Sequence, residues 1–245
     1  MSNIAIIIPS RMNAERLPNK PLKLINKKEM ILHVYDVAKN SNVGDVIVAT
    51  PDHEILDLIK KHNGQAVLTS NKHKTGTDRV FEVFEKKLKS TPEIIINFQG
   101  DMPNLNPQAI KNLVEHMKKN LCDIATLASH IENNYEERDP NVVKVVAEKN
   151  IKNKLFSKAV DFFRISNTPL NEHTYHHVGI YAFTNKALIR YVSLDRSKLE
   201  IKRKLEQLRA LEDNMKIDVG YIDACPLSVD TEKDLVAVRK VMENK

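Results

Sequence analysis

Short apolar runs alternate with amphipathic stretches along the first three fifths of the chain, and this alternation constrains the fold more than any other feature. The runs are brief and rich in isoleucine and valine, so they are predicted to be strands, and the stretches between them have helical spacing. The predicted strands cover residues 4–9, 46–50, 66–69, 93–98, 124–131 and 142–147. The predicted helices between them cover residues 30–39, 52–62, 81–89 and 107–119. Strands that are apolar along their whole length and separated by helices predict an α/β protein whose parallel sheet is covered by helices on both faces.

The second half of the chain is less regular. Residues 178–184 and 217–222 are predicted to be strands, and residues 198–211 and 232–242 helices. Residues 161–176 contain proline, asparagine and several histidines, which is typical of a loop or a small lobe. Because no repeat or long linker interrupts the chain, a single domain over residues 1–245 is expected, with 161–176 as its irregular segment.

Composition excludes several classes of protein. The chain has 245 residues, of which 42% are hydrophobic, and no apolar run approaches the ~20 residues that a membrane span needs. Residues 4–8 are too short, and lack the preceding basic segment, for a signal peptide. The cysteines, Cys122 and Cys225, are far apart, and neither they nor the nine histidines show the spacing of a zinc site. A cytoplasmic protein with reduced thiols and no membrane partner is expected.

The net charge of +6 raises the question of a nucleic-acid partner. The lysines are interspersed with acidic residues, as around residue 200, and this pattern is typical of solvated helix faces. An anionic small substrate accounts for local positive charge equally well, so no nucleic-acid partner is predicted.

A basic loop follows the first predicted strand. It carries Arg11, Arg16 and Lys20 and is stiffened by two prolines. In open α/β sheets, ligands bind outside the carboxyl ends of the strands. Arginine forks and a lysine point charge at such a position suit a polyphosphate. A merely solvated basic loop is the alternative.

Carboxylates occupy two other candidate positions. Asp101 follows the strand at 93–98 directly after Gly100, and Asp230 precedes the helix at 232–242. Mg²⁺ is usually held by one or two carboxylates together with substrate phosphates, so the pair could form a magnesium site. The alternatives are a turn-forming aspartate at 101 and a helix N-cap at 230 or 231.

A turn with small and hydroxyl side chains precedes the predicted helix at 81–89. It contains Thr75, Gly76 and Thr77, and small residues of this kind allow the backbone to approach an anionic ligand closely. The spacing is not that of a P-loop.

Taken together, the motifs resemble the 3-deoxy-manno-octulosonate (Kdo) cytidylyltransferases. They occur in the family's order and cover nearly the whole chain. The matching stretches are 7–21, 33–34 with 48–50, 75–79, 99–101, 143–145, 156–157, 177–181, 205–209 and 229–231.

The resemblance implies a Rossmann-like nucleotidyltransferase fold with a mixed, mostly parallel sheet. It implies transfer of CMP from CTP to the anomeric hydroxyl of Kdo, giving CMP-Kdo and pyrophosphate for lipopolysaccharide synthesis, by a cytoplasmic homodimer. The resemblance also implies residue roles. The triphosphate would be bound by Arg11 and Lys20 with Arg16, and the nucleotide by Thr75, Gly76, Thr77 and Gln99. Mg²⁺ would be bound by Asp101 and Asp230, and the sugar acid by Arg164, His177, Glu206 and Gln207. Of these, Arg11, Lys20 and Asp101 are the predicted catalytic residues. From the residues alone, His177 is more simply a structural side chain.

The chain departs from the family pattern mainly where the sugar acid is expected. Lys158 replaces a customary arginine, and Asp161 adds a negative charge near an anionic substrate. Arg203 stands where a glutamate is usual. Other departures, in the loop at 14–19 and at 228–232, flank the predicted phosphate and metal residues. Other sugar acids, such as 8-amino-Kdo, and a non-catalytic nucleotide-binding module are the alternative functions.

Overall fold

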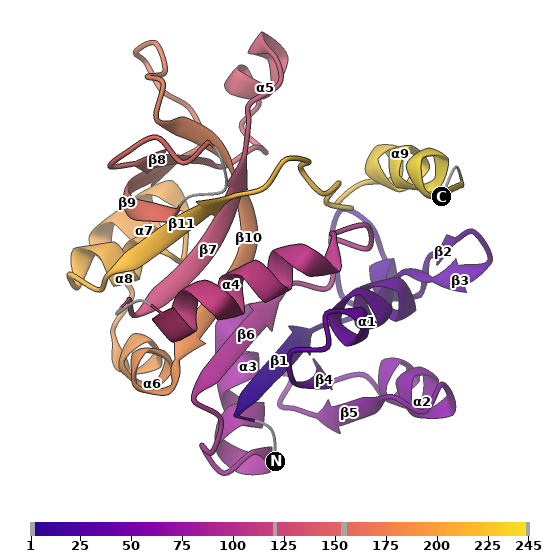
Figure 1. The fold of residues 1–245 in the computed structure, drawn as a ribbon. Helices are drawn as coiled ribbons and strands as arrows, with labels where there is room; N and C mark the ends of the chain where they lie inside the picture. Colours follow the sequence, from indigo (N-terminus) through magenta and orange to yellow (C-terminus); the bar gives the residue numbers. More distant parts are fainter. Residues whose placement is uncertain (1–2, 120–121, 153–155, 244–245) are drawn as a thin grey trace. The chain divides into compact units, whose positions relative to one another are not determined.

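The computed structural model describes residues 3–119, 122–152 and 156–243, which form two compact units (Figure 1). The first unit comprises residues 1–111 and 226–245, and the second comprises residues 112–225. The single domain expected over residues 1–245 stays a prediction. None of the described helices is long and apolar enough to cross a membrane.

The first unit is built on a parallel sheet. Its strands are β1 (Ile4–Pro9), β4 (Asp45–Thr50), β5 (Gln65–Leu68) and β6 (Ile94–Phe98), in the order β5-β4-β1-β6. Strand β1 pairs in parallel with both β4 and β6, and its side chains are buried throughout. These strands lie within a residue of their predicted positions, as expected of runs that are apolar on both faces.

Helices and short elements complete this unit. They are η1 (Lys20–Leu22), the hairpin β2 (Leu24–Ile25) and β3 (Lys28–Glu29), α1 (Met30–Asn40), α2 (His53–Lys61), α3 (Gly76–Glu82), the π-turn η2 (Val83–Lys87), the start of α4 (Pro107–Lys119), and α9 (Glu232–Glu243). The predicted helix at 81–89 begins earlier, at Gly76. A capping box explains the difference, because the Thr75 hydroxyl accepts from the Asp78 amide while the Asp78 carboxylate accepts from the Thr75 amide.

The C-terminal segment packs against the basic loop of the same unit. A buried cluster joins Val229, Leu235 and Val238 to Leu17, Ile25 and Met30. The Arg239 guanidinium also donates to the Leu24 carbonyl oxygen at 2.8 Å. This packing holds the segment before α9 beside residues 10–20 and so fixes the position of Asp230.

The second unit has a mixed sheet in which antiparallel pairs predominate. Its elements are β7 (Ile124–Ser129), α5 (Asn134–Arg138), β8 (Lys144–Ala147), β9 (Phe156–Phe163), β10 (Thr174–Thr184), α6 (Asn185–Ser193), α7 (Lys198–Arg203), α8 (Leu208–Glu212) and β11 (Ile217–Tyr221). The strand order is β10-β7-β11-β9-β8, and β8 also pairs with β10. Only β7 and β11 run parallel to each other among the described pairs of this unit. The predicted mixed sheet is confirmed, and most of the described parallel strand pairs lie in the first unit.

The irregular segment predicted at 161–176 is shorter in the structure. Strand β9 continues to Phe163 and β10 begins at Thr174. Both ends pair with β8, since Phe163 lies opposite Lys144 and Thr174 opposite Val146. Too few residues separate β8 from β9 for a crossover helix, so the two strands pair antiparallel.

The helix predicted at 198–211 is divided into α7 and α8. Lys204 adopts a left-handed backbone with φ of 54° and ends α7. The break lets the chain fold back, and the Arg209 guanidinium on α8 forms two hydrogen bonds to the Glu200 carboxylate on α7, at 2.8 and 2.9 Å. A periodic sequence pattern does not reveal such a long-range ion pair.

Candidate active site

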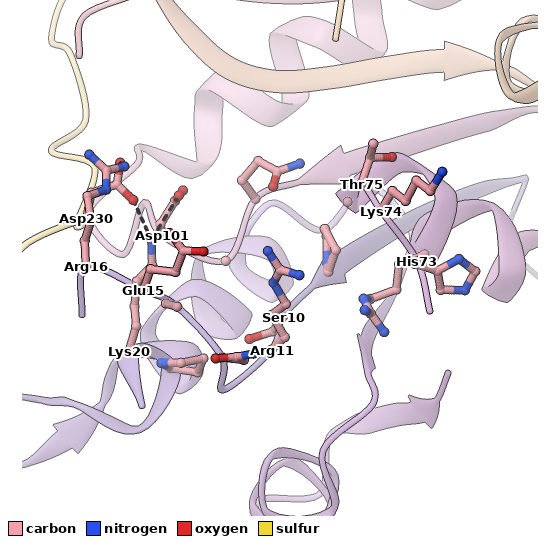
Figure 2. Close-up of a pocket in the computed structure, with 18 residues that line it drawn as sticks. Ser10, Arg11, Glu15, Arg16, Lys20, His73, Lys74, Thr75, Asp101 and Asp230 are labelled. Atoms are coloured by element: carbon pink, nitrogen blue, oxygen red, sulfur yellow. Dashed lines mark hydrogen bonds and ion pairs between the residues drawn. The ribbon is translucent and has the colours of Figure 1, made fainter. Parts of the chain in front are cut away.

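Three strand-end segments and the segment before α9 meet in the first unit around a cavity of about 640 Å³ (Figure 2). They are the loop after β1, the turn before α3, the residues after β6, and Asp230. The lining residues are Pro9, Ser10, Arg11, Asn13, Ala14, Glu15, Arg16, Lys20, Pro21, His73, Lys74, Thr75, Gly76, Arg79, Gln99, Gly100, Asp101 and Asp230. The structure therefore gathers in one cavity most of the residues predicted to bind the nucleotide and the metal.

Lys20 bridges the two predicted metal-binding carboxylates. Its Nζ lies 3.3 Å from Asp101 Oδ2 and 2.9 Å from Asp230 Oδ1. The Arg16 Nη2 pairs with the other oxygen of Asp230 at 3.1 Å. The dashed lines in Figure 2 mark the two ion pairs of Lys20. Asp101 and Asp230 are thus close enough in space to act on one cation.

The two carboxylates differ in their electrostatic environment. Burial raises the pKa of Asp101, and the nearby Lys20 offsets this only in part. Burial also opposes ionisation of Asp230, but Lys20 and Arg16 outweigh it and lower the pKa of that carboxyl. Burial and a neighbouring carboxylate both disfavour the ionised form of a carboxyl group, so a further positive charge stabilises that form.

Asp230 is not needed as the cap of α9. The Thr231 hydroxyl accepts from the Asp234 amide at 3.3 Å, and Asp234 Oδ2 accepts from the amides of Asp230 and Thr231. The Val229 amide donates to the Asp101 carbonyl oxygen at 2.9 Å, which ties the two segments together. Because Thr231 and Asp234 bond to the free amides at the start of α9, the Asp230 carboxylate is left to pair with Lys20 and Arg16.

Gln99 reaches the cavity at the end of a buried hydrogen-bond chain. Its Nε2 donates to Asn97 Oδ1 at 2.7 Å, and Asn97 Nδ2 donates to the Thr77 hydroxyl at 3.2 Å. A Cβ on Gly76 would lie 3.3 Å from the Gln99 amide, so glycine there leaves the amide room. Thr75 and Gly76 line the cavity, whereas Thr77 lies buried behind Gln99.

Three basic side chains of the cavity were absent from the predicted site residues: His73, Lys74 and Arg79. The His73 ring bonds to Glu82 at 2.5 Å, and Arg79 donates to the Ser70 carbonyl oxygen at 3.0 Å. Burial and the nearby Arg11 lower the pKa of Arg79. All three flank the predicted turn at 75–77, and the basic residues on both sides of that turn are the sequence signal for them.

The donor set of the cavity suits a hard divalent cation. Asp101 and Asp230 supply carboxylate oxygens, the ligands that Mg²⁺ prefers. The surrounding Arg11, Arg16, Lys20, Lys74 and Arg79 supply positive charge for phosphate oxygens. The cavity can therefore accommodate a metal-bound polyphosphate.

In the second unit, His177 is a buried, neutral side chain. It is 6% exposed, and burial, with a smaller effect of His176, lowers its pKa to about 3. Its Nε2 lies 2.9 Å from the Thr126 hydroxyl oxygen, and that hydroxyl donates to the Ile180 carbonyl oxygen at 2.7 Å. Since the one hydroxyl proton is directed to Ile180, His177 Nε2 carries the proton and donates to Thr126.

Glu206 and Gln207 lie between α7 and α8. Burial raises the pKa of Tyr181, and the charge of the Glu206 carboxylate adds to the effect. The Tyr181 ring lies 5.5 Å from the His177 ring. Tyr181 thus lies beside His177, while the mostly buried Gln207 precedes α8.

Arg164 lies elsewhere in this unit, at a cavity of about 630 Å³ that Asp161 and Arg203 also line. Its guanidinium donates to the Pro140 carbonyl oxygen at 2.9 Å.

Arg203 Nη1 pairs with Asp161 Oδ1 at 2.6 Å and donates to the Phe162 carbonyl oxygen. Two departures from the family pattern thus compensate each other, because Arg203 neutralises the charge of Asp161. Lys158 is exposed on β9.

A double-mutant cycle can measure this compensation. Both partners are about a third or more exposed, at 33% and 40%. Asp161→Ala and Arg203→Ala, alone and together, are expected to give a coupling free energy of about 0.2–1 kcal/mol in urea unfolding, as for exposed ion pairs. Additive effects of the two substitutions would contradict the pairing.

A parallel α/β unit with a cation-rich cavity, one carboxylate after a strand end and a second before α9 is typical of a nucleotide-binding enzyme. The family model described as "Cytidylyltransferase" matches residues 5–217. A 3-deoxy-manno-octulosonate cytidylyltransferase from Bartonella tribocorum is 42% identical over 97% of both chains. One from Rhodopseudomonas palustris is 43% identical over 97% of this chain and 96% of its own. The chain belongs to the 3-deoxy-manno-octulosonate cytidylyltransferase family.

Solved structures agree with this assignment. The structure of a CMP:2-keto-3-deoxy-manno-octonic acid synthetase complexed with CTP matches with a TM-score of 0.89 and 35% identity, over 99% of both chains. A 4-diphosphocytidyl-2C-methyl-D-erythritol synthase from Anaerococcus prevotii, with a TM-score of 0.66 and 14% identity, shares the fold. The nucleotidyltransferase fold expected from the sequence is confirmed.

Proposed function

We propose that this protein transfers CMP from CTP to the anomeric hydroxyl of Kdo, releasing pyrophosphate and supplying CMP-Kdo for lipopolysaccharide synthesis. The observation that carries the proposal is the full-length match to a Kdo-activating synthetase solved with CTP. The curated relatives named for the same activity support it over 97% of the chain.

Within the cavity of the first unit, we assign the triphosphate to the basic loop. Arg11, Arg16 and Lys20 are placed to neutralise phosphate oxygens, and Arg11 and Lys20 would stabilise the negative charge that develops on the leaving pyrophosphate. Nucleotidyl transfer of this kind needs chiefly positioning and electrostatic stabilisation. Thr75, Gly76 and Gln99 would seat the nucleotide, with Thr77 supporting Gln99 from behind.

Asp101 and Asp230 are the proposed ligands of Mg²⁺. The cation would supply positive charge to the phosphates and help to orient the reacting groups. Lys20, which contacts both carboxylates, would keep them at the spacing that one shared cation requires. Asp101 gains most from such a cation, because burial disfavours its ionised form.

Arg164, His177, Glu206 and Gln207 are proposed to serve the sugar acid, as the family resemblance implies. Arg164 can bind a carboxylate through its guanidinium. Neutral, buried His177 can take part only through hydrogen bonds, since its pKa of about 3 keeps it uncharged near neutral pH. A cytoplasmic location, a homodimer and a single catalytic domain are further parts of the proposal that rest on the resemblance.

A panel that crosses four nucleoside triphosphates with several 2-keto sugar acids tests the function. Pyrophosphate release is expected with CTP, Mg²⁺ and Kdo, and EDTA should abolish it until Mg²⁺ is restored. Preference for 8-amino-Kdo or another acid would reassign the acceptor. Nucleotide binding without turnover across the whole panel would indicate a non-catalytic module and contradict the proposal.

A further inference from the structure

A second group of chemically reactive side chains lies in the second unit, apart from the residues considered above. His116 on α4, Cys122 before β7 and Asp218 on β11 bring one nitrogen, one sulfur and one oxygen within 4.8 Å of one another. The His116 Nε2 lies 2.8 Å from Asp218 Oδ2. Among the described residues, this is the one group of three or more such side chains whose ligand atoms lie so close together.

The three side chains are largely buried, and packing fixes the histidine ring. Cys122 is 5% exposed, and the His116 and Asp218 side chains are 11% and 8% exposed. The Phe156 ring stacks on His116 with centroids 3.8 Å apart and planes 6° apart. Gly220 makes this possible, because a Cβ at that position would collide with the Phe156 ring. The fold thus fixes the orientation of the His116 ring without a bound ligand.

We infer that His116, Cys122 and Asp218 form a binding site for a divalent transition-metal cation, Zn²⁺ in the first place. Imidazole nitrogen, thiolate sulfur and carboxylate oxygen are the three ligand types that Zn²⁺ takes in proteins. The residues come from three separate segments, which explains why sequence spacing gave no indication of the site. A site of this kind would stabilise the second unit by linking the end of α4 to β11.

The geometry needs only small adjustments. Zinc–ligand bonds of about 2.0–2.3 Å place tetrahedral ligand atoms roughly 3.3–3.8 Å apart. The His116–Asp218 pair at 2.8 Å would open slightly and the Cys122 sulfur would move inward. Water can take the fourth position from the side on which His116 is exposed.

The cysteine changes its protonation state in this process. Burial raises the pKa of the Cys122 thiol to about 12, and the Asp218 carboxylate acts in the same direction. The thiol loses its proton to solvent as the sulfur–metal bond forms, while the His116 proton that faces Asp218 moves from Nε2 to Nδ1 so that Nε2 can bind; the metal thus exchanges with one proton. In the metal-free protein the thiol instead donates weakly to Met117 Sδ at 3.4 Å.

The alternative is a structural hydrogen-bonded pair of His116 and Asp218, with Cys122 nearby only by packing. Lys216 Nζ, 3.8 Å from Asp218 Oδ2, would then share the carboxylate. This reading gives the cysteine no function, and it predicts no metal-dependent signal from the sulfur.

Cobalt substitution distinguishes the two readings in the full-length protein. With Cys225→Ser as the parent, Cys122 is the only thiol in the chain. Titration with Co²⁺ should give a thiolate-to-cobalt charge-transfer band that saturates at one equivalent and is displaced by Zn²⁺. The active-site carboxylates cannot produce this band, because they contain no sulfur.

Variants then test each ligand. Cys122→Ser should abolish the band, and His116→Ala and Asp218→Asn should each weaken cobalt binding at least ~10-fold. His173→Ala, at a more exposed histidine of the same unit, is the control and should change nothing. Absence of the band in the parent, or unchanged affinity in well-folded His116 and Asp218 variants, would overturn the site. Zinc-edge X-ray absorption of the unsubstituted protein gives a test without ligand variants, since a first shell lacking sulfur would also overturn it.

Discussion

Replacing Asp101 with asparagine is expected to slow CMP transfer at least ~100-fold, the scale on which groups that stabilise transition-state charge usually act. The substitution keeps the shape of the side chain and removes its charge. It leaves Lys20 with one anionic partner, Asp230, and removes half of the proposed cation site. The measurement is kcat for pyrophosphate release at saturating CTP, Kdo and Mg²⁺.

A matched control separates this effect from a general loss of charge. Glu54 is an exposed carboxylate in the first turn of α2, in the same unit as Asp101. Glu54→Gln should retain wild-type kcat and the same unfolding midpoint. If Asp101→Asn turned over within a few-fold of the parent, the assigned metal role of Asp101 would be wrong.

The largest expected effect on stability comes from Glu200→Gln, which should lower the free energy of unfolding by about 3–5 kcal/mol. The Glu200 side chain is 1% exposed and accepts hydrogen bonds from Arg209 and Arg196. Removing its charge takes away the carboxylate to which the buried Arg209 guanidinium is hydrogen-bonded. Glu212→Gln, an exposed carboxylate on α8, is the control and should cost less than about 1 kcal/mol.

The same pair predicts a pH dependence of stability. Burial opposes ionisation of Glu200, but hydrogen bonds from Arg209 and Arg196 prevail and lower the pKa of its carboxyl. The stabilisation is therefore complete above the ordinary carboxyl pKa and is lost as the pH falls through the lowered value. In urea unfolding at a series of pH values, Glu200→Gln should lose part of the acid sensitivity of the parent; an identical pH profile would contradict the ion pair.

The first unit could be predicted because its determinants are local in the sequence. Each strand is a continuous apolar run, and the rule that ligands bind at strand ends led directly to Arg11, Lys20 and Asp101. The start of α3 was missed because a capping box at Thr75, and not apolar periodicity, defines it. The family resemblance, and not the local sequence, indicated Asp230 as a metal ligand, and the structure shows that Thr231 and Asp234 satisfy the start of α9.

The second unit was harder to predict because long-range pairing determines it. The break at Lys204 accompanies an ion pair between Arg209 and Glu200, which lie on different helices. The compensation between Asp161 and Arg203 joins residues 42 positions apart, so each looked like an isolated departure. The ends of β9 and β10 are strands because β8 pairs with both. None of these pairings follows from periodicity or composition.

Phosphorus-31 NMR of the running reaction tests the central claim most directly. With CTP, Kdo and Mg²⁺, the three CTP resonances should decline while one phosphodiester resonance and inorganic pyrophosphate appear in equal molar amounts. Mass spectrometry of the new species should give the mass of CMP-Kdo. Formation of CDP and orthophosphate, or no change in the CTP resonances with any sugar acid, would contradict the assignment of this protein as a Kdo cytidylyltransferase.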